Sequence, residues 1–229
     1  MQKIKLMTDS VCDISTENER KYGIQVVPIR IELGGRTYVS RVDFDNMQFY
    51  QMMDEYEGIP VTSQVTPFEF AELFEEHYHN GCTDIIYVAM NSAGSATYTN
   101  ACLAATEFYE THPEAEEKFR IHNIDSGTYT GCYGYAVAEA GRMIEDGFSA
   151  EATVAFIRDW CENSVAIFVP YTLKYAAKSG RIPAIAAHMG NALGIRPVMR
   201  LHDHQIVAVG KVRSEKNIIP EVIQRSTLE

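Results

Sequence analysis

The feature that most constrains the fold is a repeated order of apolar strand, polar loop and helix. Apolar runs typical of buried strands occupy residues 3–8, 24–33, 84–90 and 119–124. Helical patterns follow, at about residues 16–23, 45–56, 66–79, 97–109, 131–145 and 150–161. Because strands that alternate with helices form a parallel sheet covered by helices, four such units predict an α/β fold.

Capping patterns place the start of two helices. Thr66, Pro67 and Glu69 provide an N-cap, a first-turn proline and an N3 carboxylate. We therefore expect Thr62 and Ser63 in the loop just before this helix. Thr16 and Glu19 are expected to form the capping box of the first helix, which ends at Gly23.

The pattern changes near residue 163. A strand at 165–170 is followed by two short helices at about 173–178 and 184–193, a hairpin at 195–201 and 205–211, and a last helix. We predict two domains: an N-terminal α/β domain at residues 1–163 and a second α/β domain at 164–229.

Charge and cysteine content exclude several classes of protein. The formal net charge is −11 and no face is expected to be basic, which argues against a nucleic-acid partner. Five cysteines without a CxxC motif argue against a disulfide framework or a zinc site and favour the reducing cytoplasm. No apolar run reaches the 18 residues of a membrane span, and the first residues lack the apolar core of a signal peptide.

Two loops rich in hydroxyl groups are the strongest candidates for a binding site. Thr62-Ser63 and the segment 91–95, which contains Ser92 and Ser95, both precede predicted helices. Helix N-termini offer unpaired N–H donors and partial positive charge, so two facing loops would bind a carboxylate or phosphate. The alternative is that these hydroxyls only cap their own helices.

Catalytic and metal-binding interpretations have less support. Neither Ser92 nor Ser95 lies in a GxSxG elbow, and no histidine follows a predicted strand of the first domain to act as its base. Surface positions are expected for the histidines, and structural roles for Asp9, Asp13 and Asp125. A small-molecule kinase or hydrolase acting on an anionic substrate is the alternative function, but it would need a nucleotide or metal site that the sequence does not show.

Two arginines of the second domain occupy positions suited to an anionic partner. Arg181 follows a Ser-Gly turn, and Arg213 ends a predicted strand. Guanidinium groups at such positions can contact a phosphate or an acidic surface. Structural salt bridges are the alternative.

An ordered set of motifs gives the sequence its family resemblance. It resembles the DegV family of bacterial lipid-binding proteins in these blocks: Thr8-Asp9-Ser10 with Asp13, Thr62-Ser63-Gln64, Asn91-Ser92 with Ser95-Ala96-Thr97-Tyr98, Asp125-Ser126, Thr172-Leu173-Lys174-Tyr175, Ser179-Gly180-Arg181-Ile182, Ile195-Arg196-Pro197-Val198 and Gly210-Lys211-Val212-Arg213. Each block alone is weak, but their order along the whole chain is specific.

The resemblance implies a function as well as a fold. DegV-like proteins have two α/β domains with a fatty acid in a tunnel between them, and the carboxylate is held by residues that match Thr62 and Ser92. Some members present this carboxylate to a separate fatty acid kinase subunit, in which residues matching Arg181 and Arg213 are implicated. Dihydroxyacetone kinase shares the general fold. We therefore expect a non-catalytic fatty-acid carrier without cofactor or metal.

Other expectations concern the supporting residues and the chain end. Ser63 and Ser95 are expected to support the head-group donors. The acyl tail is expected to lie against Ile167, Leu173, Ile185, Met189 and Leu193. Family members continue with a histidine-containing Gly-Pro-Gly segment that this sequence lacks, so we expect the second α/β domain to be truncated at its C-terminus.

Overall fold

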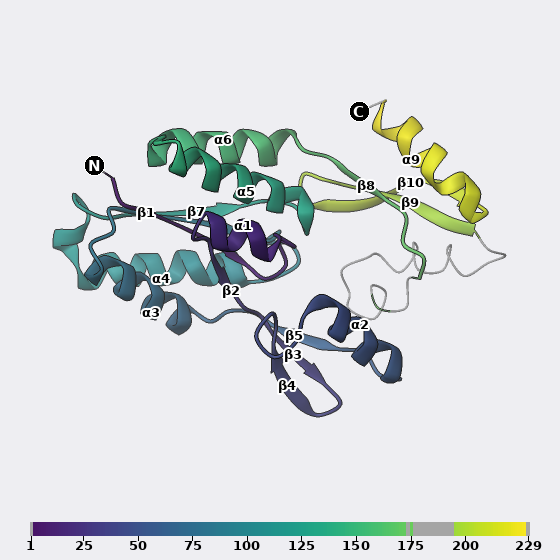
Figure 1. Cartoon of the computed structure of the whole chain (residues 1–229), viewed down its shortest axis with the longest axis horizontal. Helices are drawn as coiled ribbons and strands as arrows, with labels where there is room; N and C mark the ends of the chain where they lie inside the picture. The colour runs from purple at the N-terminus through teal and green to yellow at the C-terminus, as the bar shows by residue number, and fades with distance from the viewer. Residues whose placement is uncertain (1, 173–174, 176–194, 228–229) are drawn as a thin grey trace. The chain divides into compact units, whose positions relative to one another are not determined.

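The computed structural model describes residues 2–172, 175 and 195–227. The chain divides into two compact units, Met1–Asn163 and Ser164–Glu229 (Figure 1). The helices expected at about 173–178 and 184–193 fall on positions that, apart from residue 175, lie outside the described residues.

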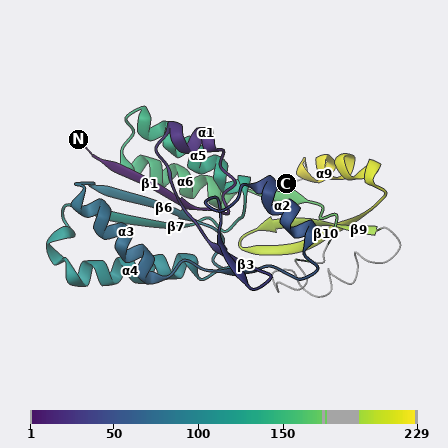
Figure 2. The same ribbon diagram turned by 60° about the horizontal axis from the view of Figure 1, so that its bottom comes forward.

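A four-stranded parallel sheet forms the centre of the first unit. Its order is β2 (Gln25–Val27), β1 (Ile4–Asp9), β6 (Asp84–Ala89) and β7 (Arg120–Asp125). Every neighbouring pair is parallel, and Figure 2 shows β1, β6 and β7 side by side. All six residues of β6 are buried, as expected for a strand covered on both faces. The predicted parallel, helix-flanked sheet is confirmed.

Helices cover both faces of this sheet. On one face, α3 (Pro67–His79) and α4 (Thr97–Thr111) pack Phe70, Phe74 and Phe108 against the strands. On the other, α5 (Gly131–Glu145) and α6 (Ala150–Asn163) contribute Val137 and Ile157 (Figure 1). Two separate apolar clusters therefore hold the sheet between two helical layers.

The second predicted strand run, 24–33, does not form one strand. It breaks at Pro28 into β2 and β3 (Arg30–Leu33), which join different sheets. The β3 strand pairs antiparallel with β4 (Arg36–Val39) and with β5 (Val61–Ser63), and Thr62 lies opposite Ile31. The expectation that Thr62 and Ser63 lie in a loop is therefore wrong, because pairing with β3 makes them part of a strand.

One of the two predicted capping patterns is confirmed and the other is wrong. The Thr66–Glu69 capping box begins α3, and Asp45 caps α2 (Asn46–Glu55). Helix α1 (Thr16–Lys21) is capped by Ser15 instead of Thr16, since the Ser15 hydroxyl accepts a 3.1 Å hydrogen bond from the amide of Asn18. A 3-10 turn, η1 (Pro113–Ala115), follows α4.

The second unit contains an antiparallel sheet in the order β10-β9-β8. Its strands are β8 (Ala166–Phe168), β9 (Ile195–His202) and β10 (Gln205–Arg213). The predicted hairpin between β9 and β10 is confirmed, as is the last helix, α9 (Ile218–Ser226), which follows the short turn η2 (Glu215–Asn217). The small apolar core of the second unit contains Val198, Val212 and Ile218.

A buried carboxyl group joins the strand ends of the first unit. Asp9, at the end of β1, is fully buried and accepts hydrogen bonds from the Tyr133 hydroxyl at 2.7 Å, the Met90 amide at 2.7 Å, the Val11 amide at 3.0 Å and the Tyr87 hydroxyl at 3.5 Å. Burial raises the pKa of this carboxyl above its ordinary value of 3.8, and the four donors act in the opposite direction. One side chain thus connects β1, β6 and α5.

Replacement of this carboxyl by an amide should destabilise the fold. In Asp9→Asn, the amide NH₂ faces two donors that now have no acceptor, so we expect a loss of about 2–4 kcal/mol in the free energy of unfolding in urea. Asp54→Asn, at an exposed position on α2, is the matched control and should change stability by less than about 0.5 kcal/mol.

The loss should also depend on pH. Because the folded-state pKa of Asp9 is raised, its contribution is fully present below about pH 3.8 and is lost as the pH rises through the folded pKa. The difference in the free energy of unfolding between wild type and Asp9→Asn should therefore be larger near pH 4.5 than near pH 8. An equal difference at both values would contradict a buried, titrating carboxyl group.

Candidate functional site

The segment after β6 carries the first group of candidate residues. Asn91 is buried, its amide donates a 2.9 Å hydrogen bond to the Thr128 carbonyl, and its side-chain Oδ1 accepts from the Ala93 amide at 2.9 Å. The Ser92 amide donates to Asp125 Oδ1 at 3.1 Å, an oxygen that also accepts from Gly127. The carboxyl ends of β6 and β7 therefore hold Ser92 in place through its backbone.

The hydroxyl groups differ in how they are engaged. Ser92 is half-buried, Thr62 and Ser63 are exposed, and within the described residues none of these three hydroxyls has a hydrogen-bond partner. The Ser95 hydroxyl lies 2.9 Å from Thr97 Oγ1 and accepts a hydrogen bond from the Thr97 amide at 3.3 Å. Ser95 therefore stabilises the start of α4, whereas no group in the described part of the chain engages the other three hydroxyls.

Contacts at Val65 tie the Thr62 segment to the Ser92 segment. The buried Val65 amide donates to Thr97 Oγ1 at 3.4 Å, and the Asn100 side-chain amide donates to the Val65 carbonyl at 2.7 Å. Val65 lies three residues after Thr62, and Thr97 and Asn100 lie in the first turn of α4. The structure thus connects the two hydroxyl segments at the N-terminus of this helix.

Two helix N-termini follow the carboxyl ends of β6 and β7, at the edge of the sheet that carries Ser92. The N-caps of α4 and α5 are Ala96 and Thr130, and neither side chain caps its helix. The first N–H groups of a helix carry partial positive charge, which favours an anion nearby. The edge therefore combines hydroxyl donors with a local field suited to a carboxylate or phosphate.

A close approach fixes the loop between Ser92 and Ser95. A Cβ atom added to Gly94 would lie 2.0 Å from the hydroxyl oxygen of Tyr129, a distance that no side chain tolerates. Tyr129 belongs to the connection between β7 and α5, so a larger residue at position 94 would have to shift the Tyr129 side chain where these two loops pack. No sequence pattern pointed to Tyr129, because its contact with Gly94 joins distant parts of the chain.

Substitution of this glycine should disturb the candidate site. In Gly94→Ala the methyl group must displace the Tyr129 ring, and we expect a loss of about 1–3 kcal/mol in the free energy of unfolding. Gly131→Ala is the matched control because nothing lies within 4 Å of its added Cβ. Gly131→Ala should leave stability unchanged or raise it slightly. Thermal unfolding of both variants measures this, and equal losses of stability in the two would contradict the proposed packing.

The remaining predicted residues belong to the second unit of the chain. Arg213 is exposed at the end of β10 in the second unit, and no ion pair involves it in the described part of the chain. Arg181 lies outside the described residues, as do the predicted tail contacts Leu173, Ile185, Met189 and Leu193, whereas Ile167 is half-buried in β8.

The histidines are not all at the surface. His77 is buried on α3, with its Nε2 atom 2.6 Å from Gln25 Oε1, and burial lowers its pKa below the ordinary 6.5. The expectation of surface histidines is wrong for this residue, because it packs against the edge strand β2. Among the described residues, no group of three or more His, Cys, Asp or Glu side chains is placed to hold a metal ion.

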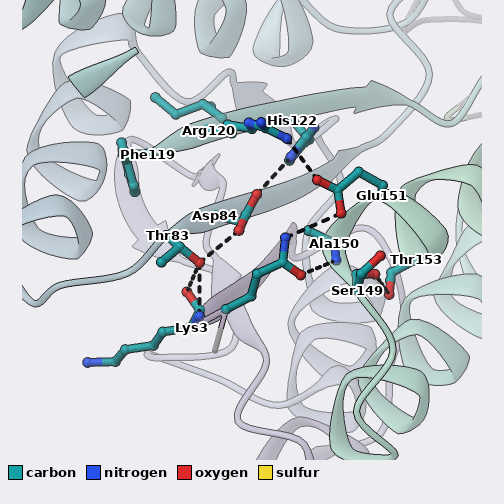
Figure 3. A network of polar contacts seen from close by, with 12 residues as sticks. Lys3, Thr83, Asp84, Phe119, Arg120, His122, Ser149, Ala150, Glu151 and Thr153 are labelled. Carbon is teal, nitrogen blue, oxygen red and sulfur yellow. Dashed lines mark hydrogen bonds and ion pairs between the residues drawn. The ribbon is translucent and has the colours of Figure 1, made fainter. Parts of the chain in front are cut away.

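A network of polar contacts connects the opposite, amino end of the sheet (Figure 3). The buried Asp84 carboxylate lies 3.2 Å from His122 Nε2 and accepts a 2.8 Å hydrogen bond from the Thr83 hydroxyl. Glu151 of α6 pairs with Arg120 at 2.8 Å. These contacts join strands and helices away from the hydroxyl loops, so we assign them a structural role.

A polar pocket of about 530 Å³ lies between the start of α1 and the start of α2. It is lined by residues 13–16 and 41–48, and does not include Thr62 or Ser92. Arg41, one of the lining residues, pairs with Glu19 Oε2 at 2.7 Å and donates a 3.1 Å hydrogen bond to the Ile14 carbonyl. Because this arginine is already paired, we interpret the pocket as part of the packing of α1.

Comparison with known proteins identifies the family. The sequence profile of the DegV family of uncharacterised proteins matches residues 3–229. A DegV domain-containing protein of Clostridium acetobutylicum is 33% identical over 216 residues, which cover 94% of this chain and 74% of the relative. The chain therefore belongs to the DegV family.

Solved structures agree with the fold. A DegV family protein from Thermus thermophilus, described as binding fatty acid, superposes with a TM-score of 0.85 at 26% identity over 99% of this chain and 78% of that one. A stearic-acid-binding protein from Eubacterium ventriosum also gives 0.85, at 27% identity, over 99% of this chain and 75% of that one. In the described residues, no helix has the length and apolar character needed to cross a membrane.

Proposed function

We propose that this chain binds a long-chain fatty acid and that the Thr62 and Ser92 hydroxyls donate hydrogen bonds to its carboxylate. The observation that carries the proposal is a pair of hydroxyls without a hydrogen-bond partner among the described residues, on two segments joined at Val65 beside the start of α4. The fatty acids bound by the Thermus and Eubacterium proteins support the ligand class.

Neutral donors suit a ligand whose affinity comes from its tail. Each buried CH₂ group contributes roughly 0.8 kcal/mol, so a chain of about 16 carbons supplies ample gross affinity. The head group then needs only enough donors to fix its position and to favour a carboxylate over an uncharged end. Hydroxyls and helix N–H groups meet that need without a buried positive charge.

Loss of either hydroxyl should weaken fatty acid binding. Thr62→Ala and Ser92→Ala each remove one donor to a charged acceptor, so we expect losses of about 1–3 kcal/mol in binding free energy. Because both donors share one carboxylate, the loss of binding free energy in the double variant should differ from the sum of the two single losses. Thr106→Ala, exposed on α4, is the control and should bind normally.

The measurements are native mass spectrometry and displacement of a fluorescent fatty acid. Protein purified from bacteria should carry a fatty-acid adduct, and displacement gives the affinities of the variants. Wild-type affinity in both single variants, with unchanged circular dichroism, would refute the assignment of the head-group donors. Absence of any saturable binding in wild type would refute the ligand class.

The second part of the proposal is presentation of the carboxylate to a separate kinase subunit. Arg213 supports it, since an exposed guanidinium without an ion pair in the described part of the chain can contact a phosphate or an acidic surface. Arg181 is proposed to act with it. Neither arginine is needed for the hydrogen bonds to the head group.

Charge reversal at Arg213 should separate binding from presentation. We expect Arg213→Glu to keep fatty acid affinity within about tenfold, or 1.4 kcal/mol, and to reduce acyl-phosphate formation by a fatty acid kinase catalytic subunit by more than that factor. Arg36→Glu, exposed in the first unit, is the control and should support acyl-phosphate formation at the wild-type rate. If phosphorylation falls only in parallel with the melting temperature, Arg213 has a structural role and the presentation proposal fails.

A further inference from the structure

The connection from β7 to α5, residues 126–130, contains a strained backbone position. Thr130 has φ 55° and ψ −144°. This region is essentially restricted to glycine, and a β-branched residue there is a clear outlier. Thr130 is exposed and its side chain does not cap α5, so among the described residues no hydrogen bond of its hydroxyl offsets the strain.

The same connection contains an unsatisfied hydroxyl group. Thr128 is only 4% exposed, and its Oγ1 atom has no hydrogen-bond partner among the described residues. A buried polar group without a partner has lost its water without replacement, which destabilises the conformation that holds it. Thr128 lies two residues before Thr130, so two unfavourable features fall in one short loop.

This loop contacts the Ser92 segment directly. The Thr128 carbonyl accepts from the Asn91 amide at 2.9 Å, and Asp125, just before the loop, accepts from the Ser92 amide at 3.1 Å. The Tyr129 hydroxyl packs on Gly94. The loop therefore cannot move without altering the surroundings of the proposed carboxylate donor.

We propose that residues 126–130 form a two-state element of the head-group site. A carboxylate bound at Ser92 favours a second conformation, in which the Thr128 hydroxyl donates to the head group and Thr130 leaves the glycine region. The strained conformation belongs to the ligand-free state. This inference rests on the proposed binding of a fatty acid and adds a third hydroxyl to its site.

Thermodynamic linkage predicts that a substitution in this loop changes stability and ligand affinity in opposite directions, which a purely structural role does not predict. A ligand shifts a two-state equilibrium only by its differential affinity for the two states. A substitution that relieves the strain of the ligand-free state therefore raises its stability and weakens ligand binding by the same factor. A residue that merely supports the fold would instead lower stability when replaced.

Two substitutions test this in the full chain. Thr130→Gly relieves the strain, because glycine adopts positive φ freely, and Thr128→Val removes the unsatisfied hydroxyl at nearly constant shape. Thr153→Val is the matched control: Thr153 is equally buried, but its hydroxyl donates to the Ser149 carbonyl at 2.9 Å. The readouts are the melting temperature without ligand and the affinities for oleate and oleyl alcohol, measured by displacement.

The expected results have opposite signs for stability and binding. Thr130→Gly should raise the melting temperature and weaken oleate binding by roughly three- to tenfold. Thr128→Val should keep or raise the melting temperature and weaken oleate at least about fivefold, with oleyl alcohol within about twofold of wild type. Thr153→Val should lower the melting temperature and leave both affinities unchanged.

Other outcomes discriminate between the two levels of the proposal. No saturable oleate binding in wild type would refute the proposed function itself. If wild type binds oleate, unchanged or tighter binding by Thr130→Gly would overturn the two-state loop alone. Equal losses for oleate and oleyl alcohol in Thr128→Val, or parallel losses of stability and affinity in both variants, would likewise overturn it.

Discussion

The rest of the first unit depends on the hydrogen bonds that the buried carboxyl group of Asp9 accepts. This group is fully buried, no cation is among its hydrogen-bond donors, and it accepts from two backbone amides and two tyrosine hydroxyls. A buried charge is tolerated only where its acceptor capacity is satisfied. Because the donors come from the residues just after β1, from β6 and the residue that follows it, and from α5, satisfying this group fixes where the two strands end and where the polar loops begin.

Much of the fold could be predicted from local sequence patterns, and the predictions that were wrong have a common cause. The buried run of β6 and the capping box of Thr66 and Glu69 are signals contained within a few residues, and both predictions were confirmed. The assignment of Thr62 to a loop failed because its strand exists only through pairing with β3, about thirty residues earlier in the chain. Strand formation depends on partners that sequence spacing does not show.

The same distinction applies to the candidate site. Ser92 was predicted from its place after a buried strand, and the structure places it at that strand end. Ser95 matched the same pattern, but its hydroxyl is engaged at the start of α4. Gly94, Tyr129 and Thr128 were missed, since their significance comes from a close approach and an unsatisfied atom that only a three-dimensional arrangement reveals.

The small antiparallel sheet gives the site a property of its own. Thr62 lies on β5, which pairs only with β3 among the described strands, whereas Ser92 follows β6, an inner strand of the main sheet. The spacing of the two hydroxyls is therefore set at a joint between two sheets, near Val65, and not by the geometry of either sheet. Substitutions along the β3–β4 hairpin can therefore alter that spacing, and with it the selectivity of the proposed head-group site, without touching the core of the main sheet.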